Sequence, residues 1–150
     1  MPHHAAGLRL ASHDESSMVA AIARETRTHF MPYLPVLHSF EEDERFFRDI
    51  VFRECDVWVS TDKGAVVGFC AFKENWLDHL YLLPNHVRQG RGRALLQIAK
   101  ERNDTLQLWV FQANIQAIRF YEGNGFCLIK RTDGAGNEEN CPDALYAWHR

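Results

Sequence analysis

Short apolar runs with strand-like spacing occur along the whole chain, separated by segments rich in Gly, Pro, Asn and Asp. Runs bounded by such turn-forming residues are typical of β-strands. Two of the runs are joined by Thr61–Gly64, whose composition favours a tight turn, so they predict a hairpin. The predicted strands cover residues 7–11, 57–60, 65–72, 76–83, 106–111, 126–131 and 144–148.

Four other segments carry apolar residues at helical spacing. Ser12 with Glu15, and Ser39 with Glu42, have the capping-box spacing that begins a helix. The first of these helices is expected to end near Thr28. The apolar stripe of the second consists of Phe46, Phe47, Ile50 and Val51. The later helices are predicted near residues 94–100 and after the N-cap Asn114, the last one ending at Gly123 or Gly125.

The predicted order is strand, helix, helix, three strands, helix, strand, helix and two strands. Such an order requires both hairpins and crossover helices, which together give a mixed sheet. A chain of 150 residues is long enough to bury one hydrophobic core. The sequence therefore predicts a single domain over residues 1–150, of class α/β with a mixed sheet of the α+β kind.

Composition and charge narrow the class of protein further. No run reaches the roughly 20 apolar residues of a membrane span, and residues 1–7 lack the apolar centre of a signal peptide. We therefore expect a cytoplasmic protein with no membrane partner. A formal net charge of -3 gives no overall attraction to nucleic acid. The four cysteines lack metal-ligand spacing and are expected to be free thiols, and we assign no metal site, including at His3 and His4.

A glycine-bearing, basic loop follows the predicted strand 76–83 and opens the helix near residues 94–100. Backbone N–H groups at a helix start have no helical partner, and glycines let a phosphate approach them closely. A plain arginine-rich turn is the alternative interpretation. A dinucleotide fingerprint fails because Leu95 occupies the third glycine position, and no Gly-Lys-Ser/Thr sequence is present. The anion-binding residues would be Arg88, Gln89, Gly90, Arg91, Gly92, Arg93 and Ala94.

Two motifs in order resemble the GNAT superfamily of N-acetyltransferases. Gln89-x-x-Gly92-x-Ala94 is similar to the family signature Gln/Arg-x-x-Gly-x-Gly/Ala. A second family feature lies downstream, where Asn114-x-x-Ala117-x-x-Phe120-Tyr121 precedes Gly125-Phe126. The resemblance covers nearly the whole chain, because the predicted element order is also similar to that of the family.

The resemblance implies a sheet splayed into a V, with acetyl-CoA as the cosubstrate in the opening. The loop segment would hold its pyrophosphate, the backbone N–H of Leu82 would polarise the acetyl carbonyl, and Asn114 would contact the cofactor arm or serve only as an N-cap. The loop between Pro84 and Gln89 is longer than the family's usual form. Either Arg88 or Gln89 is therefore expected to make the leading phosphate contact.

The family reaction is direct attack of a substrate amine on the thioester within a ternary complex. Tyr121 matches the family tyrosine that protonates the departing thiolate. An amine with a pKa of about 10 is mostly protonated at neutral pH, so a base or a water chain must take its proton. Glu74, Asp78 and His79 are the candidates. Alternation predicts Asp78 on the strand face of Leu80 and Leu82, and His79 on the other.

The acceptor is expected to be a primary amine of a small molecule, peptide or protein, and the sequence does not choose among these. The segment Phe30–Pro35 would wall the acceptor site, and residues 134–143 would either attract a cationic amine or form a polar hairpin. A homodimer is left open. The alternative function is a non-catalytic acyl-CoA-binding sensor or interaction module, followed by a nucleotide-binding regulator.

Overall fold

The computed structural model describes residues 7–150, so His3 and His4 lie outside it. Within this range no helix is both long and apolar enough to cross a membrane. The strands are β1 Leu8–Leu10, β2 Asp56–Asp62, β3 Ala65–Lys73, β4 Trp76–Leu82, β5 Thr105–Phe111, β6 Cys127–Arg131 and β7 Asp143–His149. The α-helices are α1 Ser16–Phe30, α2 Phe40–Phe46, α3 Phe52–Glu54, α4 Arg91–Glu101 and α5 Ile115–Gly123.

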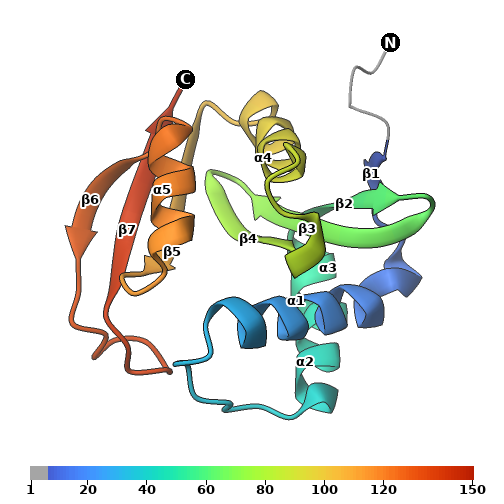
Figure 1. Cartoon of the computed structure of the whole chain (residues 1–150), viewed down its shortest axis with the longest axis horizontal. Coiled ribbons are helices and arrows are strands. Elements are labelled where there is room, and N and C mark those ends of the chain that lie inside the picture. Colours follow the sequence, from blue (N-terminus) through green and yellow to red (C-terminus); the bar gives the residue numbers. More distant parts are fainter. Residues whose placement is uncertain (1–6) are drawn as a thin grey trace.

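The described strands form one mixed sheet in the order β1-β2-β3-β4-β5-β7-β6. Every pairing is antiparallel except that of β4 with β5, which are parallel and share the single register pair Trp76 and Gln107. Gln107 N–H also donates to Asn75 O at 2.8 Å beside this pair. Beyond it β4 and β5 diverge, so the sheet consists of two halves that separate toward the centre of the molecule (Figure 1). The predicted class and the mixed sheet are confirmed.

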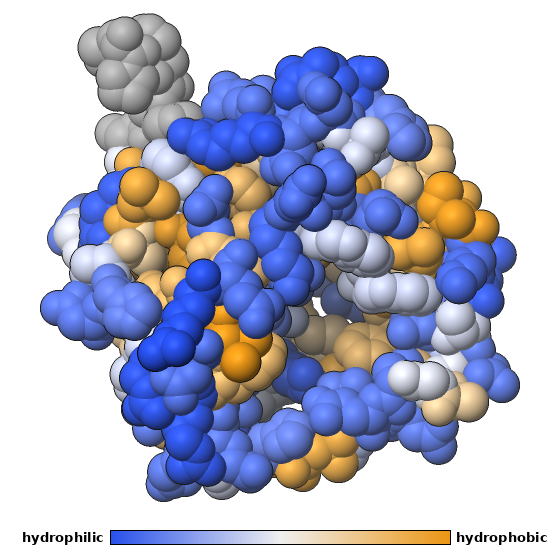
Figure 2. Space-filling model, turned by 180° about the vertical axis from the view of Figure 1, so that it is seen from behind, coloured by the Kyte–Doolittle hydropathy of each residue, from blue (hydrophilic) through white to orange (hydrophobic). Residues whose placement is uncertain are grey.

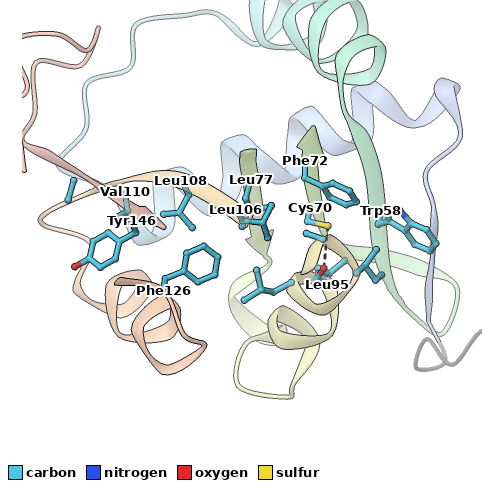
Figure 3. Close-up of a cluster of buried hydrophobic side chains, with 14 residues drawn as sticks. Trp58, Cys70, Phe72, Leu77, Leu95, Leu106, Leu108, Val110, Phe126 and Tyr146 are labelled. Carbon is cyan, nitrogen blue, oxygen red and sulfur yellow. Dashed lines mark hydrogen bonds between the residues drawn. The ribbon is translucent and has the colours of Figure 1, made fainter. Parts of the chain in front are cut away.

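Helices cover the sheet on both faces, and each face has its own apolar cluster. One cluster packs α4 and α5 against the sheet and includes Leu95, Leu108 and Phe126. It runs across both halves of the sheet, from Trp58 on β2 to Tyr146 on β7 (Figure 3). The second cluster packs α1 and the helices after it against β2 and β3. Both halves are therefore held by buried apolar area, although they share little backbone pairing.

The predicted helix caps are present. Ser39 Oγ accepts from Glu42 N–H at 3.1 Å, and Glu42 Oε1 accepts from Ser39 N–H at 2.8 Å. Asn114 Oδ1 accepts from Ala117 N–H at 3.3 Å and so caps α5. The helix expected after Ser12 begins with a 3₁₀ turn, His13–Glu15, and extends to Phe30 rather than Thr28.

The second helix differs from its prediction in its middle. Residues Phe47–Val51 form a π-helical turn between α2 and α3. Phe47 and Val51 are buried, but Phe46 and Ile50 remain 47% and 42% exposed, so only half of the predicted apolar stripe faces the core. A π turn carries more residues per turn than an α-helix and shifts the buried stripe, which an α-helical period does not anticipate.

Candidate active site

A cleft of about 600 Å³ opens where β4 and β5 separate. Its walls come from α1, β4, β5, the first turn of α4 and most of α5. Seen from behind, the surface is hollowed near its centre, with apolar side chains inside a largely hydrophilic rim (Figure 2). The splay of the sheet thus creates a site whose residues come from the two diverging strands and from α1, α4 and α5 beside them.

The start of α4 forms one end of the cleft, and its backbone geometry is unusual. Gly90 is the N-cap and has a left-handed conformation, with φ 81° and ψ 0°. Arg88 also has a positive φ of 62°, which is uncommon for a residue with a side chain. A Cβ on Gly92 would lie 3.4 Å from Phe120 Cζ and 3.5 Å from Leu82 Cδ1. The helix start therefore has no side-chain cap, lies close to β4, and is suited to bind an anion at its free N–H groups.

The arginines of this segment have different roles. The Arg91 guanidinium donates to Ser60 Oγ at 3.1 Å and to Thr61 O at 3.0 Å, which fixes α4 to β2. The Gln89 side chain accepts from Arg91 Nε at 3.1 Å. Arg88 and Arg93 line the cleft, although Arg93 Nε also donates to Asn124 Oδ1 at 3.3 Å. The side chains of Gln89 and Arg91 face the other partners named above. Of the predicted phosphate-binding side chains, the structure brings Arg88 and Arg93 to the cleft.

The longer loop before α4 is attached to the first hairpin. Pro84–His86 forms a 3₁₀ turn, and His86 Nε2 lies 3.4 Å from Asp62 Oδ2. Asp62 Oδ1 is also 3.7 Å from Arg91 Nη2. The residues that lengthen the loop therefore pack against the β2–β3 hairpin and leave the start of α4 accessible from the cleft.

The free edge of β4 lines the middle of the cleft. Leu83 N–H donates to Val67 O on β3 at 2.9 Å. Because successive N–H groups of a strand point to opposite edges, the N–H groups of Leu82 and Leu80 point toward the cleft. The position predicted for the Leu82 N–H is thus compatible with the strand geometry.

Tyr121 lies on α5 beside the cleft, among aromatic rings. Its ring centroid is 5.3 Å from that of Phe120 and 5.5 Å from that of Phe126. Burial, and to a lesser degree the nearby Tyr81 and Cys70, raises the pKa of the Tyr121 hydroxyl well above its usual value. The hydroxyl therefore holds its proton throughout the neutral range.

The three predicted base candidates occupy different places. Glu74 is exposed in the turn between β3 and β4 and does not line the cleft, whereas Asp78 and His79 do. Ala71 pairs with His79 and Phe72 with Leu77, so Asp78 is the extra residue of a β-bulge.

The predicted face of Asp78 is wrong because this bulge interrupts the alternation. The Asp78 carboxylate lies 3.4 Å from Lys73 Nζ and accepts from Cys55 Sγ at 3.6 Å. Cys55 packs on the side of α1 to α3, whereas Leu80 and Leu82 pack on the side of α4. Asp78 therefore lies on the same side of the sheet as His79.

His79 is surrounded by aromatic side chains. Its ring centroid is 5.2 Å from that of Phe47, 6.2 Å from that of Phe69 and 6.0 Å from that of Tyr81. Its Nδ1 is buried and has no hydrogen-bond partner among residues 7–150. Burial lowers the pKa of His79 to about 4, with the Asp78 charge opposing this shift. The imidazole is therefore neutral at pH 7.

Two loops meet at the end of the cleft opposite α4. The loop after α1 and the loop between β6 and β7 come together there (Figure 1). Arg27 Nη2 lies 2.6 Å from Glu139 Oε2, and His38 Nε2 lies 3.2 Å from Glu138 Oε2. The sequence left open that this acidic segment attracts a cationic amine. In the structure Glu139 already pairs with Arg27, and Glu138 lies beside His38, which can take up a proton.

Several cleft residues were not among those predicted from the sequence. Trp109 and Phe111 lie on the open face of β5, and Gln116 and Arg119 follow Asn114 on α5. Leu108 and Val110 of β5 face the core. Strand alternation could therefore have predicted that Trp109 and Phe111 lie on the opposite face. Among the residues described, no group of His, Cys, Asp and Glu could hold a metal ion.

Comparison with known proteins assigns the family. Residues 53–127, half of the chain, match the acetyltransferase (GNAT) domain family. The chain therefore belongs to the GNAT family and is an acetyltransferase, as the two sequence motifs predicted.

Two relatives along most of the chain are named peptidyl-lysine N-acetyltransferases. YiaC of Escherichia coli strain K12 is 28% identical over 143 residues, covering 94% of this chain and 95% of YiaC. YjaB of Salmonella typhimurium is 28% identical over 127 residues, covering 84% of this chain and 86% of YjaB.

Solved structures show the same fold. The apo form of Escherichia coli YjaB superposes with a TM-score of 0.77 at 25% identity, covering 94% of this chain and 95% of YjaB. The PaiA N-acetyltransferase of Thermoplasma acidophilum in complex with coenzyme A has a TM-score of 0.72 at 21% identity, covering 95% and 98%. The predicted GNAT-like fold is thereby confirmed.

Proposed function

We propose that the protein transfers an acetyl group from acetyl-CoA to a primary amine by direct attack within a ternary complex. One observation carries this proposal: a single cleft connects the start of α4 with Tyr121 and continues to α1. Of the acceptor classes that the sequence left open, the lysine side chain of a peptide or protein is favoured, because YiaC and YjaB are named for that substrate.

The residues at the start of α4 fit the phosphates of coenzyme A. No side chain caps the first N–H groups of α4, and Arg88 and Arg93 add positive charge to the cleft wall. Between Arg88 and Gln89, the placement favours Arg88 for the leading phosphate contact. Asn114 lines the cleft while capping α5, so both roles considered for it are compatible. When bound, acetyl-CoA supplies the acetyl group as an activated thioester.

Tyr121 is the proposed general acid. Its hydroxyl keeps a proton at neutral pH and lies on the cleft wall between the start of α4 and the far end. The N–H of Leu82 points into the same part of the cleft and is the proposed donor to the acetyl carbonyl. The Leu82 N–H would stabilise the negative charge that develops on the acetyl oxygen, and Tyr121 would protonate the departing sulfur.

Asp78 and His79 are the proposed proton acceptors for the amine, directly or through water. Both line the cleft, and His79 is neutral at pH 7 and can accept a proton. A pH-rate profile distinguishes them: the residue whose replacement, Asp78→Asn or His79→Gln, removes the acidic limb is the base.

The test is release of free thiol from acetyl-CoA in the presence of an amine panel that includes a lysine peptide. We expect release that depends on the acceptor, together with a mass increase of the peptide by one acetyl group. Acetyl-CoA binding without acceptor-dependent release from any amine would contradict the enzyme and favour a binding module.

A further inference from the structure

The end of β2 contacts the segment that leads from β4 into α4. Three consecutive residues of β2 make these contacts, namely Ser60, Thr61 and Asp62, and none of the three lines the cleft. The segment itself supplies five residues of the cleft wall, which are Val87, Arg88, Gly90, Gly92 and Arg93. Contacts made at β2 therefore act directly on the part of the chain that forms the α4 end of the cleft.

The Asp62 carboxylate holds this segment at two points. His86 Nε2 lies 3.4 Å from Asp62 Oδ2, and Arg91 Nη2 lies 3.7 Å from Asp62 Oδ1. We call Asp62, His86 and Arg91 the brace. Its two basic members stand on either side of residues 87–90, so one carboxylate ties both ends of that stretch to β2. Because a short loop with joined ends has few conformations, the brace restricts the shape of residues 87–90.

The Arg91 end of the brace is fixed by further bonds. Its guanidinium donates to Ser60 Oγ at 3.1 Å and to Thr61 O at 3.0 Å, and Ser60 is only 1% exposed. A guanidinium presents its donors in a rigid plane, so it fixes the backbone that carries it more precisely than an ammonium group does. Arg91 thus positions the chain on both of its sides, where Gly90 and Gly92 line the cleft.

The stretch between the two ends of the brace has an uncommon backbone conformation. Arg88 has a φ of 62° and Gly90 a φ of 81°, so two of the four residues are in the left-handed region. This region is unfavourable for a residue with a side chain, such as Arg88, and persists where surrounding contacts impose it. The brace supplies such contacts on both sides. Its loss would therefore release Arg88 from the conformation in which it lines the cleft.

We propose that the brace sets the affinity for coenzyme A by holding residues 87–90 in the shape that presents Arg88 and the free N–H groups of α4 to the phosphates. Asp62, His86 and Arg91 are positioning residues in this proposal, since they lie outside the cleft wall and act through the loop. The proposal rests on the proposed function and deepens it. It gives an acidic residue a favourable effect on the binding of an anion, which charge alone would not predict.

Charge alone and the brace predict opposite effects of replacing Asp62. Coenzyme A carries several negative charges, so removal of a nearby carboxylate would strengthen its binding if only charge mattered. The brace predicts weaker binding. If residues 87–90 keep the binding shape for about a tenth of the time without it, the dissociation constant rises about ten-fold. Titration calorimetry with coenzyme A measures this constant for Asp62→Ala and for Asp62→Asn, which keeps the shape of the side chain, and both should bind more weakly than wild type.

Lysine substitutions test whether an arginine acts through its charge or through its geometry. Lysine keeps the positive charge but lacks the planar set of donors. Arg91→Lys should therefore raise the dissociation constant about as much as Arg91→Gln, because either change breaks the brace. Arg88→Lys should retain most of the affinity and Arg88→Gln should lose it, because a phosphate can be bound by a point charge.

Arg150 gives a matched control because it holds the other end of α4. It donates to Lys100 O at 2.8 Å and to Asp104 Oδ1 at 3.1 Å, and it does not line the cleft. Arg150→Lys should therefore leave the dissociation constant for coenzyme A unchanged. An effect that is confined to the brace variants does not arise from a general loosening of α4.

Backbone dynamics give a second measurement that needs no ligand. In free Asp62→Ala, the order parameters of residues 87–90 from ¹⁵N relaxation should fall below those of wild type, because the ends of the loop are no longer joined. The order parameters of the α4 interior should stay the same. Unchanged order parameters in residues 87–90 would overturn the brace.

The outcomes are distinguishable. Wild-type protein that binds coenzyme A, together with equal or tighter binding by Asp62→Ala, would overturn the brace while leaving the proposed function intact. Full affinity in Arg91→Lys would also overturn it, because charge would then explain the effect of Arg91. Wild-type protein that binds no coenzyme A would contradict the proposed function, and the brace with it.

Discussion

Two titratable side chains in the cleft are held in their uncharged forms by burial. Burial raises the pKa of Tyr121 and lowers that of His79 to about 4. One group is thus a proton donor at pH 7, and the other is a proton acceptor. Amine acetylation needs a group of each kind, although the low pKa of His79 makes it a weak base.

Tyr121→Phe removes the proposed proton donor and keeps the aromatic packing with Phe120 and Phe126. We expect kcat to fall by about a hundred-fold, the usual loss when a general acid is removed. The dissociation constant for acetyl-CoA should hardly change. Steady-state kinetics and calorimetric titration measure the two quantities, and an unchanged kcat would rule out the assigned role.

The depressed pKa of His79 predicts a pH-dependent stability. An unfolded histidine takes up a proton near its ordinary pKa of about 6.5, whereas the folded one does so only near 4. Protonation therefore favours the unfolded chain as the pH falls through this window. The stabilisation is complete above the unfolded value and is lost on approach to the folded value.

His79→Phe removes the titrating group and replaces it with a ring that suits the surrounding aromatic side chains. Relative to the variant, wild type should lose roughly 3 kcal/mol of unfolding free energy between pH 7 and pH 4, by linkage. Urea denaturation at several pH values measures the difference. Parallel pH profiles for the two proteins would show that His79 is not shielded from solvent.

At the residue scale the sequence predicted which residues belong to the site better than it predicted the side of the sheet on which a side chain lies. Tyr121 was identified through the family resemblance, and Asn114 and the glycines of the α4 start were found from local patterns. All of them lie at the cleft or its rim. The side of Asp78 was predicted wrongly, because its bulge depends on how β4 pairs with β3. A pattern along one strand does not contain that information.

Elements that begin with a local signal were predicted well. Both capping boxes and the Asn114 cap involve residues three positions apart, so the sequence contains the whole interaction. The π-helical turn Phe47–Val51 was missed, because its buried stripe is set by contact with Phe69 on β3. Helix starts are local properties, whereas the phase of a buried stripe depends on the neighbouring layer.

Gly90 and Gly64 provide a matched pair for testing the start of α4. Their φ values are 81° and 84°, and a Cβ on either would meet nothing within 4 Å. Substitution by Ala should therefore cost both variants about 1 kcal/mol of stability through backbone strain alone. Only Gly90→Ala should also weaken coenzyme A binding, by about ten-fold if one charge-assisted bond is lost.

Thermal unfolding and titration calorimetry separate these two effects. Gly64→Ala controls for strain, because Gly64 lies in the β2–β3 turn away from the cleft. Equal coenzyme A affinity in the two variants would show that the start of α4 does not hold the phosphates.

For the molecule as a whole, the mixed sheet followed from element order, but the contact between α1 and the β6–β7 loop did not. Arg27 and Glu139 are 112 positions apart, and each reads as an ordinary exposed charge in the sequence. The splay between β4 and β5 was expected only through family resemblance. Spacing along the chain does not report where a parallel pairing stops.

Acetyl-CoA should stabilise the folded protein by binding between the two halves of the sheet. At a concentration of 100 times the dissociation constant, the gain is about 2.7 kcal/mol. For a domain of this size that corresponds to roughly 5–10 °C in Tm. Differential scanning fluorimetry measures the shift. A comparable shift with ATP but none with acetyl-CoA would favour a nucleotide-binding regulator.

Because β4 and β5 share the single register pair Trp76 and Gln107, a rotation of one half of the sheet against the other would turn about this pair. Leu82 lies six positions beyond Trp76, which is about 20 Å along an extended strand. A rotation of roughly 3° about the Trp76–Gln107 pair would move Leu82 by about 1 Å, enough to reduce a reaction rate about a hundred-fold. Contacts between the two halves of the sheet resist such a rotation most effectively when they lie far from this pair. Weak interactions there can therefore control the alignment of the reacting atoms.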